Sequence, residues 1–123
     1  MTFLAVVEGD VGGWRIDRDG LTDAIRARWS RVEIDSTQRS EVRSPVWQFE
    51  TENGPGEAYL HEEGTCLYMD VWEEDAIWLA IVFRGLTPTD LDLVFCDEGY
   101  TFDVRLGAGT TEAELTNLVN AAG

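Results

Sequence analysis

Lysine is absent from the sequence, and histidine is almost absent. All nine basic residues are arginines, and His61 is the single histidine. Without lysine, the glycines at 9, 12 and 13 cannot begin a phosphate-binding loop, which needs a Gly-Lys pair followed by serine or threonine. Two cysteines and one histidine, widely spaced, are too few for a zinc site. We therefore expect no metal and no cofactor.

Long apolar runs are also missing. The longest, Ala76–Phe83, has eight residues, far fewer than the roughly 18–20 that a membrane helix needs. The first eight residues have neither the basic start nor the apolar length of a secretory signal. We therefore expect a cytoplasmic protein with no membrane contact.

Cys66 and Cys96 lie within short apolar, strand-like runs. The simplest interpretation is two buried thiols in a reducing compartment, and a disulfide between neighbouring strands is the alternative. His61 could approach Cys66 across a hairpin, but the sequence shows no nucleophile motif and no orienting partner. We expect no catalysis through these residues, and no enzyme.

Negative charge is the strongest signal in the composition. The chain has 24 acidic residues and a formal net charge of −15. Residues 1–43 contain seven arginines and eight acids, whereas residues 44–123 contain two arginines and sixteen acids. Such a surface repels nucleic acid and anionic membranes and attracts basic proteins. Solubility alone is a simpler explanation of the same charge.

The length and the 44% hydrophobic content predict a single domain over residues 1–123. Leu21, Ile25 and Trp29 are spaced four apart, which predicts a helix over about residues 20–30. Thr111 and Glu114 form a capping box that predicts a second helix over residues 111–121.

Alternating apolar and polar residues predict strands in the rest of the chain. Residues 46–52, 57–63 and 65–72 are separated by short turns and favour an antiparallel meander. Shorter runs of strand-like character lie at residues 3–7, 32–35, 91–96 and 101–106.

The apolar run at residues 76–83 has the length of a fully buried strand, and we place it at the centre of the sheet. A buried helix, capped by Asp75 and ended before Pro88, is the alternative. The expected fold class is α+β, a mostly antiparallel sheet of about six strands with two helices.

Acidic residues gather at two turns beside aromatic residues, and we expect both turns to lie at one end of the sheet. The expected partner-binding residues are Asp70, Trp72, Glu73, Glu74, Asp75, Trp78, Asp97, Glu98 and Tyr100. Aromatic anchors inside a charged rim are typical of protein interfaces. The alternative for Trp72 and Trp78 is burial in the core.

In its size, its acidity and its lack of a catalytic motif, the whole chain resembles the immunity proteins of bacterial toxin–immunity systems. The resemblance is one of general type. It implies a non-enzymatic protein that binds a cognate toxin domain, often a basic nuclease, and blocks its active site. Two alternatives remain: a small-ligand protein or enzyme with a pocket near Arg26, Arg28 and Arg31, and a subunit or chaperone of a larger complex.

Overall fold

The computed structural model describes residues 2–10, 12–29, 31–35, 46–61, 64–99 and 101–122. These ranges contain seven strands and three helices: β1 (Thr2–Glu8), α1 (Arg18–Arg28), β2 (Val32–Asp35), β3 (Val46–Thr51), β4 (Gly54–Leu60), β5 (Cys66–Asp70), α2 (Glu73–Gly85), β6 (Asp92–Asp97), β7 (Asp103–Arg105) and α3 (Glu112–Ala122). The strands form one antiparallel sheet in the order β2-β3-β4-β5-β1-β6-β7. The expected α+β class is confirmed.

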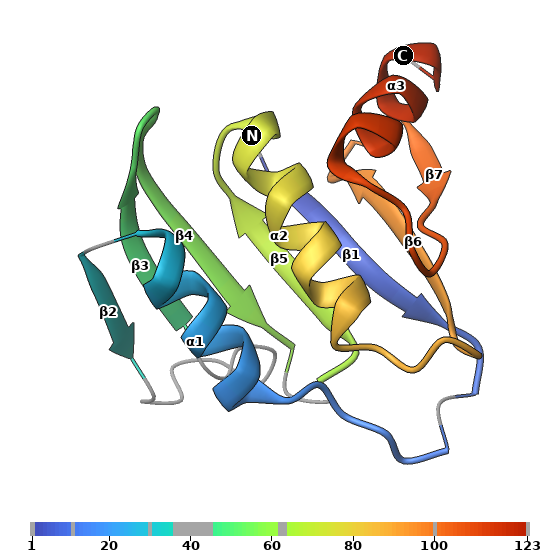
Figure 1. Cartoon of the computed structure of the whole chain (residues 1–123), viewed down its shortest axis with the longest axis horizontal. Coiled ribbons are helices and arrows are strands. Elements are labelled where there is room, and N and C mark those ends of the chain that lie inside the picture. Colours follow the sequence, from blue (N-terminus) through green and yellow to red (C-terminus); the bar gives the residue numbers. More distant parts are fainter. Residues whose placement is uncertain are drawn as a thin grey trace.

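All three helices lie on one face of the sheet (Figure 1). In β1, Phe3, Ala5 and Val7 are buried, while the residues between them are only half-buried. This period of two separates a covered face from an open face of the sheet. The predicted meander is confirmed as β3-β4-β5, although β4 begins at Gly54 instead of residue 57.

The apolar run Ala76–Phe83 is helical, so the prediction of a central strand is wrong. It forms most of α2, which lies across β5 and β1 (Figure 1). Leu79 and Phe83 are among the fully buried side chains of the core. The middle position of the sheet belongs to β5, with β1 beside it.

The reason for the error is that α2 is covered on several sides. Helices α1 and α3 contact it from either side (Figure 1), so even Ile81 and Val82 are partly buried. A helix buried in this way shows no amphipathic period, and a short apolar run then fits a strand equally well. The distinguishing signal is the flanking charge: Glu73 and Glu74 in the first turn and Arg84 in the last complement the helix dipole.

Both ends of α2 are joined to loops by buried side chains. Near its start, the Asp75 carboxylate accepts a hydrogen bond from Asn53 Nδ2 at 3.2 Å, which connects the helix to the β3–β4 turn. Near its end, Arg84 donates to the carbonyl oxygens of Pro88 at 2.7 Å and Leu91 at 2.8 Å. Charge-assisted bonds of this kind are stronger than neutral ones, so they fix the loop that leads to β6.

The other two helices begin close to their predicted positions. Helix α1 begins at Arg18, two residues before the expected start at about residue 20, and the Asp17 carboxylate caps it by accepting from the Gly20 N–H at 3.1 Å. Before α3, Thr111 Oγ1 accepts from the Glu114 N–H at 3.2 Å. The Glu114 carboxylate accepts in return from the Thr111 N–H at 3.3 Å, so the predicted capping box is confirmed.

Replacing Thr111 with alanine should lower the free energy of unfolding by about 1 kcal/mol, because alanine leaves the Glu114 N–H without its acceptor. The neighbouring substitution Thr110→Ala keeps the cap and serves as the control. It should cost less. Urea unfolding of both variants measures the difference, and the reverse order would show that the helix is capped one residue earlier.

Candidate functional site

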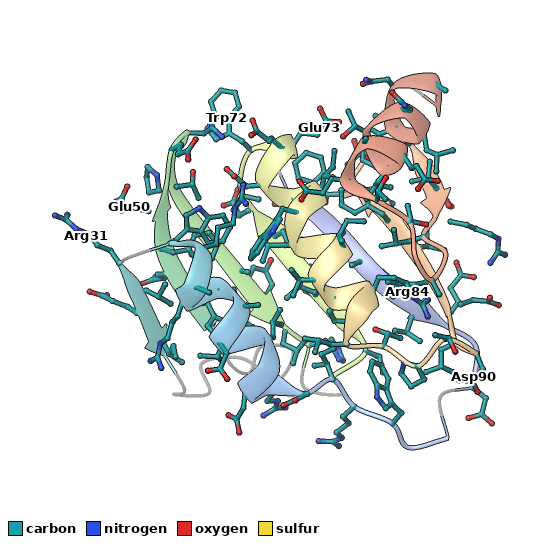
Figure 2. All side chains as sticks on the ribbon, viewed as in Figure 1. Arg31, Glu50, Trp72, Glu73, Arg84 and Asp90 are labelled. Atoms are coloured by element: carbon teal, nitrogen blue, oxygen red, sulfur yellow. The ribbon has the colours of Figure 1, made fainter. Side chains whose placement is uncertain are left out.

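A cleft opens at the end of the molecule where α2 begins. Its volume is about 740 Å³. We call it the α2 cleft. It is lined by Phe3, Pro55, Asp70, Val71, Trp72, Glu73, Asp97, Thr101, Phe102, Val119 and Asn120. Figure 2 shows Trp72 and Glu73 at this end of the molecule. Four of the nine expected partner-binding residues therefore line one cavity.

The strand order explains why the two acidic turns meet. Strand β1 is antiparallel to both neighbours, and Phe3 near its start pairs with Met69 of β5 and with Asp97 of β6. The ends of β5 and β6 therefore flank the start of β1. Because α2 follows β5 after two residues, its first turn lies at the same end of the sheet.

The floor of the α2 cleft is apolar and well packed. The rings of Phe3 and Phe102 lie 6.2 Å apart between centroids, and Phe95 contacts both, at 5.9 Å and 5.4 Å. Val71 and Val119 are also buried. A floor of this kind is rigid because its side chains are held by the core beneath them.

The rim of the cleft is exposed and acidic. Trp72 has 63% of its surface accessible, more than any other large apolar side chain among the described residues. It occupies the N-cap position of α2 but makes no capping hydrogen bond through its side chain. The exposed carboxylates of Asp70 and Glu73 lie on the same rim. An aromatic ring and two negative charges thus surround an apolar floor.

Asp97 lies in the cleft wall and has a structural role. Its side chain is buried, and its carboxylate accepts hydrogen bonds from the Thr101 N–H at 2.7 Å and from the Thr101 hydroxyl. Burial raises the pKa of this carboxyl, but the hydrogen bonds from Thr101 and the neighbouring backbone outweigh it, so the pKa is lowered. Asp97 therefore holds the turn between β6 and β7.

Asp97→Asn should lower the free energy of unfolding at neutral pH by about 1 kcal/mol, because an amide accepts these hydrogen bonds less strongly than a carboxylate. The folded-state pKa lies below the unfolded value of about 3.9. The stabilisation is therefore present above that pH and is lost as the pH falls through the folded-state pKa. Urea unfolding of both proteins should show the difference shrinking in acid, and a difference that is independent of pH would contradict this role.

The other expected partner-binding residues lie elsewhere. The Asp75 carboxylate is buried against Asn53. Trp78 is half-buried, and its ring meets that of Trp29 edge-on at 5.2 Å, so it joins α2 to the end of α1. Glu74 and Glu98 are exposed but do not line the cleft. Tyr100 is outside the described residues.

The three arginines considered as an anion site have different surroundings. The Arg28 guanidinium lies over the rings of Trp78 and Trp29, 4.7 Å and 5.7 Å from their centroids. Arg31 instead lines a different hollow, among acidic residues, and Arg26 is exposed on α1. Stacking on tryptophan is an ordinary structural use of arginine.

Both thiols are free and protonated at neutral pH. Burial raises the pKa of Cys66 to about 12, although a hydrogen bond with Tyr68 lowers it, and burial with nearby carboxylates raises that of Cys96 to about 11. The backbone N–H of His61 donates to the backbone carbonyl of Cys66 at 2.9 Å, so the two residues are neighbours, as the hairpin suggested. A protonated thiol is a poor nucleophile even beside histidine.

A disulfide between the cysteines is not compatible with the sheet. Cys66 pairs with Val6 of β1, and Cys96 pairs with Leu4 on the other side of the same strand. Two strand spacings separate their backbones by about 10 Å, which exceeds the span that a disulfide can bridge. The cysteines are therefore two separate thiols, of which Cys96 is buried, as expected, and Cys66 is only half-buried.

Comparison with protein-family models, with curated proteins and with solved structures finds no match. None of the helices in the described ranges is long and apolar enough to cross a membrane. The sequence did not predict that the apolar floor and the far wall of the cleft belong to the site. These include Phe3, Phe102 and Val119. Their apolar character predicted burial, but only the strand order brings them together.

Proposed function

We propose that this is a non-enzymatic acidic binding protein that neutralises a basic partner, and that it acts as an immunity protein that inhibits a cognate toxin domain. The observation that carries the proposal is the exposed Trp72 at the rim of the α2 cleft, beside Asp70 and Glu73 and above an apolar floor. Interface hot spots commonly consist of an aromatic anchor next to a pocket, surrounded by a polar rim.

The geometry suits a basic side chain from the partner. The aliphatic stem of an arginine or lysine would contact Phe102 and Val119, while its cation would meet the carboxylate of Glu73. The Trp72 ring adds a face on which a guanidinium can stack. The net charge of −15 favours the approach of a basic protein from a distance.

Catalysis has little support, either in the α2 cleft or at the cysteines. The two cysteines are protonated, and the buried acid in the cleft wall, Asp97, has a lowered pKa. A general acid needs the opposite shift, toward neutral pH. A protein of this kind acts by occupying its partner's surface.

Affinity capture from the native organism, followed by identification of the bound protein, tests the function. The gene of the captured partner should encode a basic toxin domain, and co-expression of this protein should restore growth to cells that express it. An acidic partner, or a toxin whose effect on growth is unchanged, would refute the proposal. A stoichiometric non-toxic partner would instead favour a subunit or chaperone.

Trp72→Ala should weaken binding of the captured partner by about 2 kcal/mol, roughly thirtyfold, mainly through faster dissociation. The matched control is Ile34→Ala on β2, which removes another exposed apolar side chain away from the α2 cleft. Surface plasmon resonance at fixed salt gives both rate constants. Equal dissociation rates for the Trp72 variant and the wild type would remove Trp72 from the interface.

Glu73→Gln together with Glu74→Gln should slow association by about threefold to tenfold and reduce its dependence on salt. Both residues are exposed, whereas Asp75 is left intact because it holds Asn53. The pair Asp23→Asn and Glu112→Gln removes the same charge from exposed positions on α1 and α3 and serves as the control. If both pairs slow association equally, only the net charge matters.

A further inference from the structure

The turn between β3 and β4 contains the only asparagine of the sequence that is followed by glycine, Asn53 before Gly54. The chain has two other asparagines, Asn117 and Asn120, which precede leucine and alanine within α3. Asn53 is exposed, so water reaches its side chain. An asparagine before glycine loses its amide group most readily, because glycine has no side chain to obstruct the approach of its backbone nitrogen.

The loss of this amide needs only water as a reactant. The backbone nitrogen of Gly54 attacks Cγ of Asn53, and the amide group leaves as ammonia with the proton of that nitrogen, so a cyclic succinimide forms. Water then opens the ring at either carbonyl carbon and gives aspartate or isoaspartate. One water molecule is consumed and one ammonia is released, and the side chain changes from a neutral amide to a carboxylate.

The geometry of the turn requires the glycine and gives the amide a structural role. Gly54 has a φ of 122°, a backbone conformation that favours glycine. The amide nitrogen of Asn53, the atom that would leave, donates to the Asp75 carboxylate at 3.2 Å. Asp75 is only 3% exposed. Deamidation would therefore replace the donor to a buried carboxylate with a second negative charge, and like charges so close together repel.

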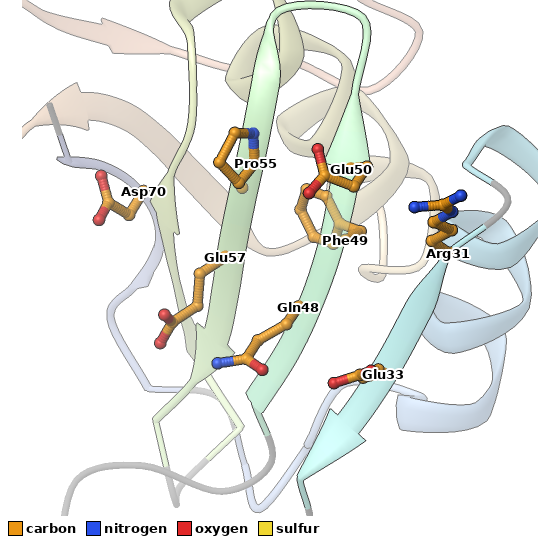
Figure 3. Close-up of a pocket in the computed structure, with 9 residues that line it drawn as sticks. Arg31, Glu33, Gln48, Phe49, Glu50, Pro55, Glu57 and Asp70 are labelled. Atoms are coloured by element: carbon orange, nitrogen blue, oxygen red, sulfur yellow. The ribbon is translucent and has the colours of Figure 1, made fainter.

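The same contact joins the turn to the rim of the α2 cleft. Asp75 lies in the first turn of α2, which is closed by a hydrogen bond from the Ala76 N–H to the Trp72 carbonyl at 2.9 Å. Pro55, two residues after Asn53, lines both the α2 cleft and the hollow on the open face of the sheet (Figure 3). A change in the turn therefore acts on the start of α2 and on the cleft wall.

We propose that Asn53 is a modification site, and that its deamidation breaks the contact with Asp75, loosens the first turn of α2 and weakens binding at the α2 cleft. The effect on binding rests on the proposed function, whereas the modification and the loosening do not. Because the reaction needs no enzyme and is not reversed by water, the modified fraction of the protein rises with its age. Older molecules would then bind the partner less well than newly made ones.

The first test measures the reaction itself. The purified protein is incubated in warm, mildly alkaline buffer, and peptide mapping by mass spectrometry follows the loss of each asparagine amide with time. Asn117 and Asn120 are internal controls in the same sample, because side chains follow them and both lie within a helix. Asn53 should react at least about tenfold faster than either control. A rate at Asn53 equal to or below theirs would overturn the proposal.

The second test measures the consequence for α2 by hydrogen exchange. Asn53→Asp, which reproduces one product, should make the Ala76 amide exchange about tenfold faster. The control Asn117→Asp adds the same charge at an exposed position of α3 and should change that rate by less than about twofold. Combining Asn53→Asp with Asp75→Asn restores a donor and an acceptor in reversed positions, so protection should recover. Unchanged exchange in Asn53→Asp, or no recovery in the double variant, would overturn the loosening.

Neither measurement uses a partner, so their outcomes do not depend on the proposed function. With the captured partner, Asn53→Asp should raise the Kd about fivefold, and Asn117→Asp by less than about twofold. An equal Kd for the Asn53→Asp variant and the wild type would overturn the link between the turn and the α2 cleft. Absence of a basic partner in the native organism would refute the proposed function and leave the modification of Asn53 standing.

Discussion

Helix α2 removes its apolar run from water by lying across β5 and β1, in the middle of the sheet. Burial of a leucine or phenylalanine contributes about 1.5–3 kcal/mol, and Leu79 and Phe83 are both fully buried there. Because α1 and α3 contact the sides of α2, their positions depend on it. The direction of α2 (Figure 1) also decides which end of the sheet receives Trp72 (Figure 2), and hence where the α2 cleft opens.

Local patterns predicted the elements that have one exposed side. The period of two in β3 to β5 and the four-residue spacing in α1 both come from an alternation between core and solvent. Thr111 and Glu114 predicted the start of α3 correctly, because a capping box is a purely local structure. Helix α2 has no such alternation, because neighbouring helices cover its sides. The charges at its two ends are the local signal that separates it from a strand, and the prediction did not use them.

The candidate site was predicted in part, for a related reason. Sequence placed acids and aromatics at two turns, and the structure brings Asp70, Trp72, Glu73 and Asp97 to one cavity. Sequence could not separate exposed acids from buried ones. Successive residues of a helix point about 100° apart, so Glu73 and Glu74 face solvent, while Asp75 points inward to Asn53.

In the proposed binding of a basic partner, charge and shape contribute differently to affinity and specificity. An exposed ion pair contributes only about 0.2–1 kcal/mol, so the many carboxylates select basic partners as a class and speed their approach. They discriminate poorly between one basic protein and another. A buried aromatic anchor contributes about 2 kcal/mol or more, and its contribution depends on a complementary surface opposite it. Recognition of one particular partner must therefore depend on how that partner fits around Trp72 and over the floor formed by Phe3 and Phe102.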